Sequence, residues 1–303
     1  MDNRKIVAGH LSALGTILIW GVTFISTKLL LKDFTPIEIL LFRFVIGYIT
    51  LFLVYPHRLK TKDFKEELLF AIAGLCGVTL YFLLENIALT FTLAANVGII
   101  VSIAPLFTAL LAYFFEGENL RAEFFIGFIV AIIGIVLVML NGSYILRVNP
   151  IGDILASLAA IVWAVYSVLM RRISRFNYNT IGCTRKVFFY GLLFMIPALF
   201  FVPCHFDYYA FTKVQNMFNL LFLGLGASAV CFVSWNWSVS ILGAVKTSVY
   251  IYIVPVITIA ASALILHEII TWVAFVGALL TLAGLYISER RTIMLVKQSD
   301  VDV

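Results

Sequence analysis

The sequence predicts an all-α integral membrane protein with ten transmembrane helices, arranged as two five-helix repeats of opposite topology. Three observations support this prediction: the composition, the number of long apolar runs, and an internal repeat at a nearly constant offset. Of the 303 residues, 63% are hydrophobic and only 12% are charged. A soluble domain carries about twice that charged fraction, so the composition argues against a soluble protein.

Charged and turn residues divide the chain into ten apolar runs. Runs of about 18 or more apolar residues are typical of membrane helices, and they must be helical because lipid offers no partner to an unpaired backbone group. The basic start of the chain is similar to a signal peptide, but the apolar segment that follows is too long for one. The predicted spans are approximately residues 7–31, 36–55, 67–90, 94–115, 121–141, 152–171, 179–202, 216–241, 246–266 and 271–289.

An internal repeat relates residues 85–118 to residues 235–268 at an offset of 150 without a gap. Each repeat holds five spans, an odd number, so the second repeat must enter the membrane upside down, as in many secondary transporters. We therefore expect repeats at 1–145 and 146–290, followed by a short cytoplasmic tail at 291–303. The matched residues include Asn86 with Asn236, Pro105 with Pro255, Glu118 with Glu268, Gly74 with Gly224, Gly127 with Gly277, and Gly134 with Gly284.

The distribution of basic residues predicts the orientation in the membrane. If the N-terminus is cytoplasmic, the cytoplasmic segments contain fourteen lysines and arginines, whereas the outer segments contain four: Lys28, Lys32, Arg147 and Lys213. Cytoplasmic loops are normally enriched in basic residues, so we expect both termini in the cytoplasm and the protein in the plasma membrane. The basic excess does not indicate a nucleic-acid partner, and the spacing of the four cysteines indicates neither a metal site nor a disulfide framework.

With LIWGVTFISTKLLL in the first span and ENIALTFTLAANVGIIVSIAPLFTALLAYFFEGE in spans 3 and 4, the chain resembles the EamA-type transporters of the drug/metabolite transporter superfamily. The resemblance covers about residues 5–290. Its most specific part is a pattern of small residues, a proline and a final glutamate, which occurs in both repeats. The resemblance implies a ten-helix carrier without a cofactor that exports amino acids, other metabolites or drugs. It also implies a central cavity lined mainly by spans 1–4 and 6–9. Lys246 stands where the first half has Asn96, so the two halves need not contribute equally to a substrate site.

Glu85 is the candidate with the clearest chemistry, because it is the acid that lies inside a predicted span. It is about four residues from the outer end of span 3. A carboxylate there either reaches the lipid headgroups or faces an outward-opening cavity, where it would bind a cationic group or a proton. Tyr81, one turn away on the same face, can share a hydrogen bond with it.

The other candidates are polar and aromatic residues within the spans. Structural alternatives stay open for each class: interhelical hydrogen bonds for the asparagines, snorkelling for the arginines and lipid-facing packing for the aromatics. Pro105 and Pro255 each remove a backbone donor and are candidate hinges. The candidate substrate-binding or cavity-lining residues are Trp20, Thr23, Arg43, Tyr81, Glu85, Asn86, Asn96, Ser102, Trp163, Tyr166, Arg185, Trp235, Asn236 and Tyr252.

We expect a secondary transporter that exports a small metabolite or drug by alternating access, and not an enzyme. An integral-membrane lipid-modifying enzyme would need a cluster of acids or histidines, and a channel would need a pore-lining ring; these are the alternatives. The expected partners are the lipid bilayer, a small-molecule substrate and, if Glu85 titrates during the cycle, protons. The sequence leaves open whether the protein is a monomer or a homodimer.

Overall fold

The structure is a computed structural model that describes residues 3–116, 122–139, 150–200, 204 and 207–301. These residues are helical apart from short connections, and they include no β-strand. Seven helical segments are long and apolar enough to cross a membrane, and three further apolar helices are shorter. The chain is therefore an all-helical, multi-pass membrane protein.

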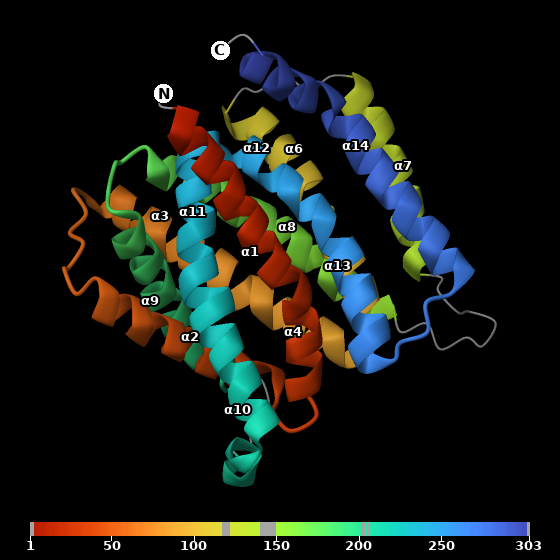
Figure 1. Cartoon of the computed structure of the whole chain (residues 1–303). Helices are drawn as coiled ribbons and strands as arrows, with labels where there is room; N and C mark the ends of the chain where they lie inside the picture. The colour runs from red at the N-terminus through yellow and green to blue at the C-terminus, as the bar shows by residue number, and fades with distance from the viewer. Residues whose placement is uncertain (1–2, 117–121, 140–149, 201–203, 205–206, 302–303) are drawn as a thin grey trace.

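Several of the long helical segments consist of two or more pieces, because π-helical or 3₁₀ turns (labelled η) interrupt the α-helix (Figure 1). The elements are α1 (Asn3–Leu30), α2 (Pro36–Val54), α3 (Phe64–Gly74), η1 (Leu75–Leu80), α4 (Tyr81–Phe91), α5 (Ala94–Val101), α6 (Ala104–Glu116), α7 (Ala122–Met139), α8 (Pro150–Ser174), α9 (Thr180–Ala198), η2 (Tyr208–Thr212), α10 (Val214–Leu221), η3 (Phe222–Val230), α11 (Cys231–Leu242), α12 (Ala244–Ser248), η4 (Val249–Ile253), α13 (Val254–Ala261), η5 (Ser262–Leu266) and α14 (Trp272–Val301). The predicted tail is thus helical as far as Val301.

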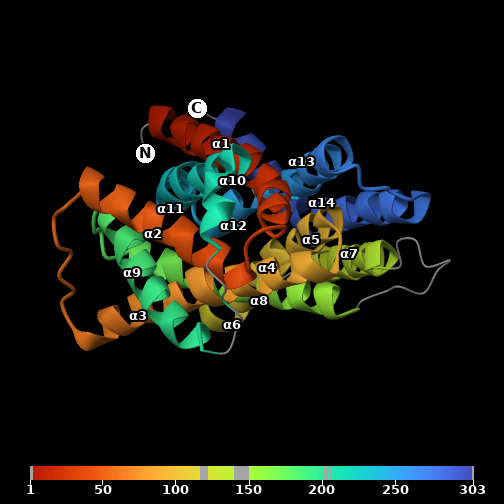
Figure 2. The same ribbon diagram turned by 90° about the horizontal axis from the view of Figure 1, so that it is seen from below.

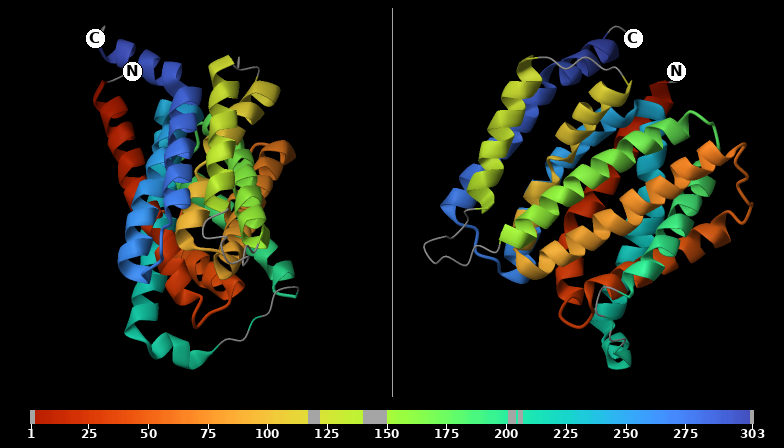
Figure 3. Two further views of the ribbon diagram at one scale, coloured as in Figure 1. Left: turned by 90° about the vertical axis from the view of Figure 1, so that its right-hand side faces the viewer. Right: turned by 180° about the vertical axis from the view of Figure 1, so that it is seen from behind.

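Both ends of the chain lie at the same end of the helix bundle (Figure 1). The view from the opposite end shows α2, α3 and α9 on one flank and α7 with α14 on the other (Figure 2), and the views in Figure 3 show the same arrangement. The main apolar core lies between these flanks and takes residues from both halves of the chain. The two halves therefore share one core.

Contacts between helices cross from one sequence half to the other. Helix α1 packs against α11 and α13, and α8 packs against α4 and α6. In the same way, α2 contacts η3 and α9, while α3 contacts α9. The halves are interleaved, so a cavity at the centre of the bundle has walls from both.

Helices α7 and α14 pack closely along one another because glycines remove side chains from their interface. A Cβ atom on Gly134 would lie 2.4 Å from the backbone nitrogen of Thr281, and one on Gly284 would lie 2.3 Å from that of Ala131. Such backbone contact is typical of small residues in membrane helices. Gly134 and Gly284, which the sequence matches to each other, thus both lie at this close helix contact.

The π-helical turn η1 positions the residues that begin α4. The backbone N–H of Tyr81 donates to the carbonyl oxygen of Cys76, five residues earlier, instead of four. Tyr166 of α8 fills the space beside Gly77, where a Cβ atom would lie 2.2 Å from its ring. A π turn shifts the register of the helix that follows and is frequent at functional sites. Here it sets the direction of Tyr81 and Glu85.

The two prolines named as hinge candidates both lie in the first turn of a helix that resumes after a break. Helix α5 ends at Val101, and α6 begins at Ala104, one residue before Pro105. In the second half, 3₁₀ turn η4 precedes α13, whose first turn contains Pro255. A proline cannot donate to the preceding turn, which explains why both helical segments are interrupted at these points.

Candidate functional site

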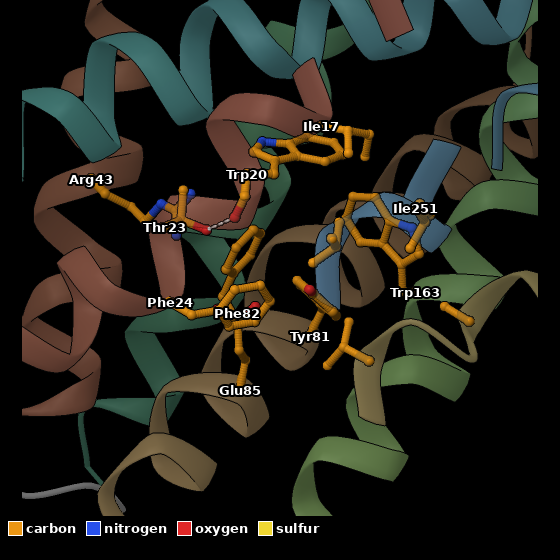
Figure 4. A pocket seen from close by; sticks show the side chains of 13 residues that line it. Ile17, Trp20, Thr23, Phe24, Arg43, Tyr81, Phe82, Glu85, Trp163 and Ile251 are labelled. Carbon is orange, nitrogen blue, oxygen red and sulfur yellow. Dashed lines mark hydrogen bonds between the residues drawn. The ribbon is translucent and has the colours of Figure 1, made fainter. Parts of the chain in front are cut away.

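A small cavity lies at the centre of the bundle, between residues from both sequence halves (Figure 4). Its volume is about 40 Å³, enough for a few water molecules but far below the ~300 Å³ of a typical ligand pocket. An organic solute would therefore bind only after the walls move apart. The lining residues are Ile17, Trp20, Thr23, Phe24, Arg43, Tyr81, Phe82, Glu85, Val101, Ala104, Trp163, Ile251 and Val254.

Arg43 of α2 lies in the cavity wall and is 1% exposed. Its Nε donates to the Oγ of Ser228 at 2.9 Å, and its guanidinium carbon lies 4.3 Å from the centroid of the Phe82 ring. Its Nη1 has no hydrogen-bond partner within the described part of the chain. The cation is thus held in place on one side and has a donor left over.

Glu85 of α4 lies in the same wall and is also 1% exposed. The Arg43 guanidinium and the Tyr81 hydroxyl are the groups that interact electrostatically with its carboxylate. Its Oε1 has no hydrogen-bond partner among the described residues. Burying an acid in a membrane bundle is costly unless it faces a partner or a cavity. The carboxylate of Glu85 and the guanidinium of Arg43 are therefore the candidate binding groups in a wall that is otherwise largely apolar.

Five aromatic rings also line the cavity. Trp20 packs edge-on against Trp163, with ring centroids 5.4 Å apart, and Tyr81 lies 4.8 Å from Trp163. The indole N–H of Trp20 donates to the carbonyl oxygen of Ala227 at 2.9 Å, which fixes the ring. Ring faces of this kind can hold an apolar side chain or a cation.

The predicted candidates Trp20, Thr23, Arg43, Tyr81, Glu85 and Trp163 all line this cavity. The hydroxyl of Thr23 donates to the carbonyl oxygen of Trp20 at 2.7 Å (Figure 4). Seven further lining residues were missed, mostly aliphatic ones such as Ile17 and Val254. An aliphatic residue in such a chain has no sequence feature that separates a cavity wall from a lipid-facing surface.

Asn86, Asn236 and Tyr166 lie outside the cavity wall and bond within the protein. Asn86 donates from Nδ2 to the carbonyl oxygen of Pro36 at 3.1 Å. Asn236 accepts from the hydroxyl of Tyr166 at 3.1 Å and donates to the Oγ1 of Thr184 at 3.0 Å. In this conformation the two asparagines join helices, which is the structural alternative that the sequence left open.

Asn96, Ser102, Trp235 and Tyr252 also lie outside the cavity wall. Asn96 donates to the Oγ1 of Thr92 at 3.3 Å, and the hydroxyl of Ser102 donates to the carbonyl oxygen of Ile99 at 2.6 Å. Trp235 is buried behind Trp20, with ring centroids 5.2 Å apart. Tyr252 packs against the apolar core from η4.

Arg185 does not line this cavity; it lines a separate cavity of about 380 Å³ together with Glu67 and Lys186. Its guanidinium donates to the carbonyl oxygens of Tyr55 and His57, the latter at 2.5 Å. Beside it, Lys186 pairs with Glu67 at 2.6 Å. These bonds fasten the connection between α2 and α3 to α9. Glu118, which the repeat pairs with Glu268, is outside the described residues.

No group of three or more histidine, cysteine, aspartate or glutamate side chains in the described ranges is placed to hold a metal ion. Cys204, in the connection between α9 and η2, donates its thiol to Oε1 of Glu38 at 3.5 Å. Burial and this carboxylate raise the pKa of the Cys204 thiol to about 11. The thiol is therefore protonated at neutral pH and is a poor metal ligand.

Comparisons with known proteins place this geometry in a family. A relative from Archaeoglobus fulgidus, named an uncharacterized transporter, is 26% identical over 93% of this chain and 97% of its own. A probable terminal-alkyne amino-acid exporter from Streptantibioticus cattleyicolor is 26% identical over 92% of each chain. A crystal structure superposes with a TM-score of 0.65 at 20% identity, covering 93% of this chain and 97% of the other, so it shares the fold. The sequence model of the EamA-like transporter family matches residues 7–140 and 150–289, and the chain therefore belongs to the EamA-like transporter family.

Proposed function

We propose that this transporter is a secondary carrier that exports a small zwitterionic solute, of the amino-acid type, through the central cavity by alternating access. The supporting observation is the pair of incompletely bonded charged groups in one wall. The Nη1 of Arg43 is a free donor for a carboxylate, and the Oε1 of Glu85 is a free acceptor for an ammonium group. The aromatic rings of Trp20 and Trp163 would then pack against the solute's side chain.

The contacts between helices support an inverted repeat. If the second half is the first half turned over, α1 corresponds to α8, α3–α4 to α10–α11, and α5–α6 to α12–α13. The contacts of α1 with α11 and α13 then correspond to those of α8 with α4 and α6. The π-helical turns η1 and η3 fall at matching places, and the family model matches the chain in two segments. We infer ten spans in two repeats, 1–145 and 146–290.

Alternating access requires that this small cavity widen toward one side of the membrane at a time. The breaks at Pro105 and Pro255 are weak points in two helical segments that border the cavity, and they are suitable hinges. The basic residues favour a cytoplasmic location for both termini and a plasma-membrane protein. Protons are a candidate coupling ion, because Glu85 is an acid in the cavity wall. Oligomeric state is left open.

Export can be tested by profiling the medium of cells that express the wild-type protein, Glu85→Gln or Glu123→Gln at matched membrane levels. Glu123 is an exposed glutamate on α7 and serves as the matched control. We expect a zwitterionic compound to accumulate outside with the wild type and with Glu123→Gln. Glu85→Gln should reduce its export about tenfold or more, because it removes a charge-assisted hydrogen bond.

Equal export by Glu85→Gln would contradict the assignment of Glu85 to substrate or proton binding. Absence of any exported compound with the wild type would contradict metabolite export itself. A second assay measures efflux from proteoliposomes loaded with the exported compound, with and without a pH gradient. A gradient changes the wild-type efflux rate if transport is coupled to protons and leaves it unchanged if it is not.

A further inference from the structure

The turn between α4 and α5 is held by residues from distant parts of the chain. Lys28, near the end of α1, donates from Nζ to the carbonyl oxygens of Leu89 and Thr92, each at 2.6 Å. These carbonyls belong to the last turn of α4 and its cap, where a helix has unpaired acceptors and a partial negative charge. A half-buried lysine cation is well matched to that position.

Glu268 holds the other side of the same turn. It lies just after η5, and its two carboxylate oxygens accept from the backbone N–H groups of Ala94 at 3.0 Å and Ala95 at 3.2 Å. These N–H groups are the first of α5, where a helix has unpaired donors and a partial positive charge. An anion and a cation from two other segments thus clamp one turn between them.

This clamp lies between two cavities. Phe24 and Glu85 line the central cavity, whereas Lys28 and Leu89 line a second cavity of about 560 Å³ at the end of the bundle away from the termini. Phe24 and Lys28 are four residues apart on α1, and Glu85 and Leu89 are four residues apart on α4. Four residues correspond to about 6 Å along a helix axis. The bond from Lys28 to Leu89 therefore lies about one helical turn from the central cavity, on the side of the outer cavity.

We propose that Lys28 and Glu268 form a latch that closes the outer end of the central cavity, and that the outward-open state requires its four hydrogen bonds to break. This inference rests on the proposed transport function. Opening the central cavity on this side means moving α1 and the end of η5 away from α4 and α5, and these four bonds link the two groups among the described residues.

The positions of the latch residues suit a reversible contact. Both Lys28 and Glu268 line the outer cavity, so water can reach the two charges when they leave the backbone. Arg43, in contrast, is fully enclosed in the central wall. Ordinary helix caps come from the residue next to the helix, whereas Glu268 lies 174 residues from Ala94. A cap supplied by another segment ties that segment's position to the helix end.

The latch can be tested without a substrate by cysteine labelling in right-side-out vesicles. Cys76, Cys183, Cys204 and Cys231 are replaced, and Thr23→Cys is introduced as a reporter in the wall of the central cavity. A membrane-impermeant maleimide is added outside. We expect Lys28→Met and Glu268→Gln to raise the labelling rate about tenfold, because each removes charge-assisted bonds that favour the closed state.

Lys32→Met is the matched control, because Lys32 lines the outer cavity and is exposed, one turn beyond Lys28; its labelling rate should equal that of the parent. Lys28→Arg, which keeps the charge, should restore slow labelling. A second reporter protein retains only Cys183, which is buried in α9; it should stay unlabelled in every variant.

Unchanged or slower labelling at Thr23→Cys in both latch variants would overturn the proposal, and so would labelling of Cys183, since that indicates general loosening. The outcome is independent of the export assay. If no solute is exported but the latch variants label faster, the proposed function fails while the contact remains a latch between two conformations.

Discussion

Arg43 of α2 and Arg185 of α9 are both buried arginines in the N-terminal half of a long apolar helix, yet their surroundings differ. Arg43 has one bond from Nε to Ser228 and an Nη1 without a partner among the described residues, next to the central cavity. The guanidinium of Arg185 donates to the carbonyl oxygens of Tyr55 and His57. The bonds of Arg185 hold a connection in place, whereas the guanidinium of Arg43 lies in the wall of the central cavity beside Phe82 and Glu85.

The acids show the same contrast. Glu67, beside Arg185, accepts from Lys186 at 2.6 Å and also from Thr61 and Tyr190. Glu85, beside Arg43, keeps an oxygen without a hydrogen-bond partner in the described part of the chain. Glu67 is 31% exposed and bonded within the protein, whereas Glu85 is 1% exposed. A charge with its bonds made inside the protein stabilises the fold, and one with an unused bond is available to a ligand, so the two sites should respond differently to substitution.

The largest expected effect is on transport by Arg43→Gln. Removing the cation should lower the transport kcat/KM for a zwitterionic solute by about 10- to 100-fold, because a charge-assisted bond to the solute carboxylate is lost. Initial rates in proteoliposomes, at several substrate concentrations, would measure this.

Ser228→Ala is the matched control, since it removes the bond to Nε and leaves the Arg43 charge in the cavity wall. Its effect on kcat/KM should be several-fold smaller than that of Arg43→Gln. An Arg43→Gln protein that transports as fast as Ser228→Ala would remove Arg43 from the substrate site and leave it as a packing residue.

Arg185→Gln should have the opposite profile, with an intermediate effect on stability and little on substrate affinity. Two partly buried carbonyl oxygens would lose a charged donor, at a cost of about 2–4 kcal/mol, which corresponds to a fall in Tm of roughly 5–10 °C. Thermal unfolding in detergent would measure the change, and KM should stay within about twofold.

Arg58→Gln provides the reference for this measurement, because Arg58 is exposed on the same connection. Its Tm should stay within about 1 °C of the wild type. A rise in KM for Arg185→Gln at unchanged Tm would show that the two arginines do similar work, and the contrast between them would fail.

The large-scale features of this contrast could be predicted from the sequence. Apolar runs predicted the membrane helices, and an acid within such a run drew attention to Glu85, because burying a charge is costly. Arg43 and Arg185 were both candidates because each is a charged residue within a predicted span. The sequence could not separate them, since the difference lies in which backbone carbonyls each guanidinium reaches after folding.

Other parts of the site depend on contacts that the sequence does not reveal. Ser228 holds Arg43 from a π-helical turn of the other repeat, and no local pattern links two residues 185 positions apart. Lys28 appears in the sequence only as one of the few basic residues expected outside. Its role depends on the break between α4 and α5, whose carbonyl groups it binds.

The smallest expected effect concerns a bonded pair that is exposed. Asp33, in the connection between α1 and α2, accepts from Lys213 at 2.5 Å and from Asn216 at 2.8 Å, and these bonds lower the pKa of its carboxyl group. A carboxyl group with a lowered pKa stabilises the folded state when the pH is above the ordinary aspartate pKa of about 3.9. This stabilisation is lost as the pH falls through the lower pKa of the folded state. Because water competes for the pair, Asp33→Asn should lower Tm at pH 7 by at most about 2 °C. The difference from the wild type should shrink below about pH 4.

Thermal unfolding at pH 7, 5 and 3.5 checks this, with Asp207→Asn as the control at the same end of the bundle. If Asp33→Asn lowered Tm as much as Arg185→Gln, solvent exposure would not reduce the contribution of this ion pair to stability, and the prediction would be wrong.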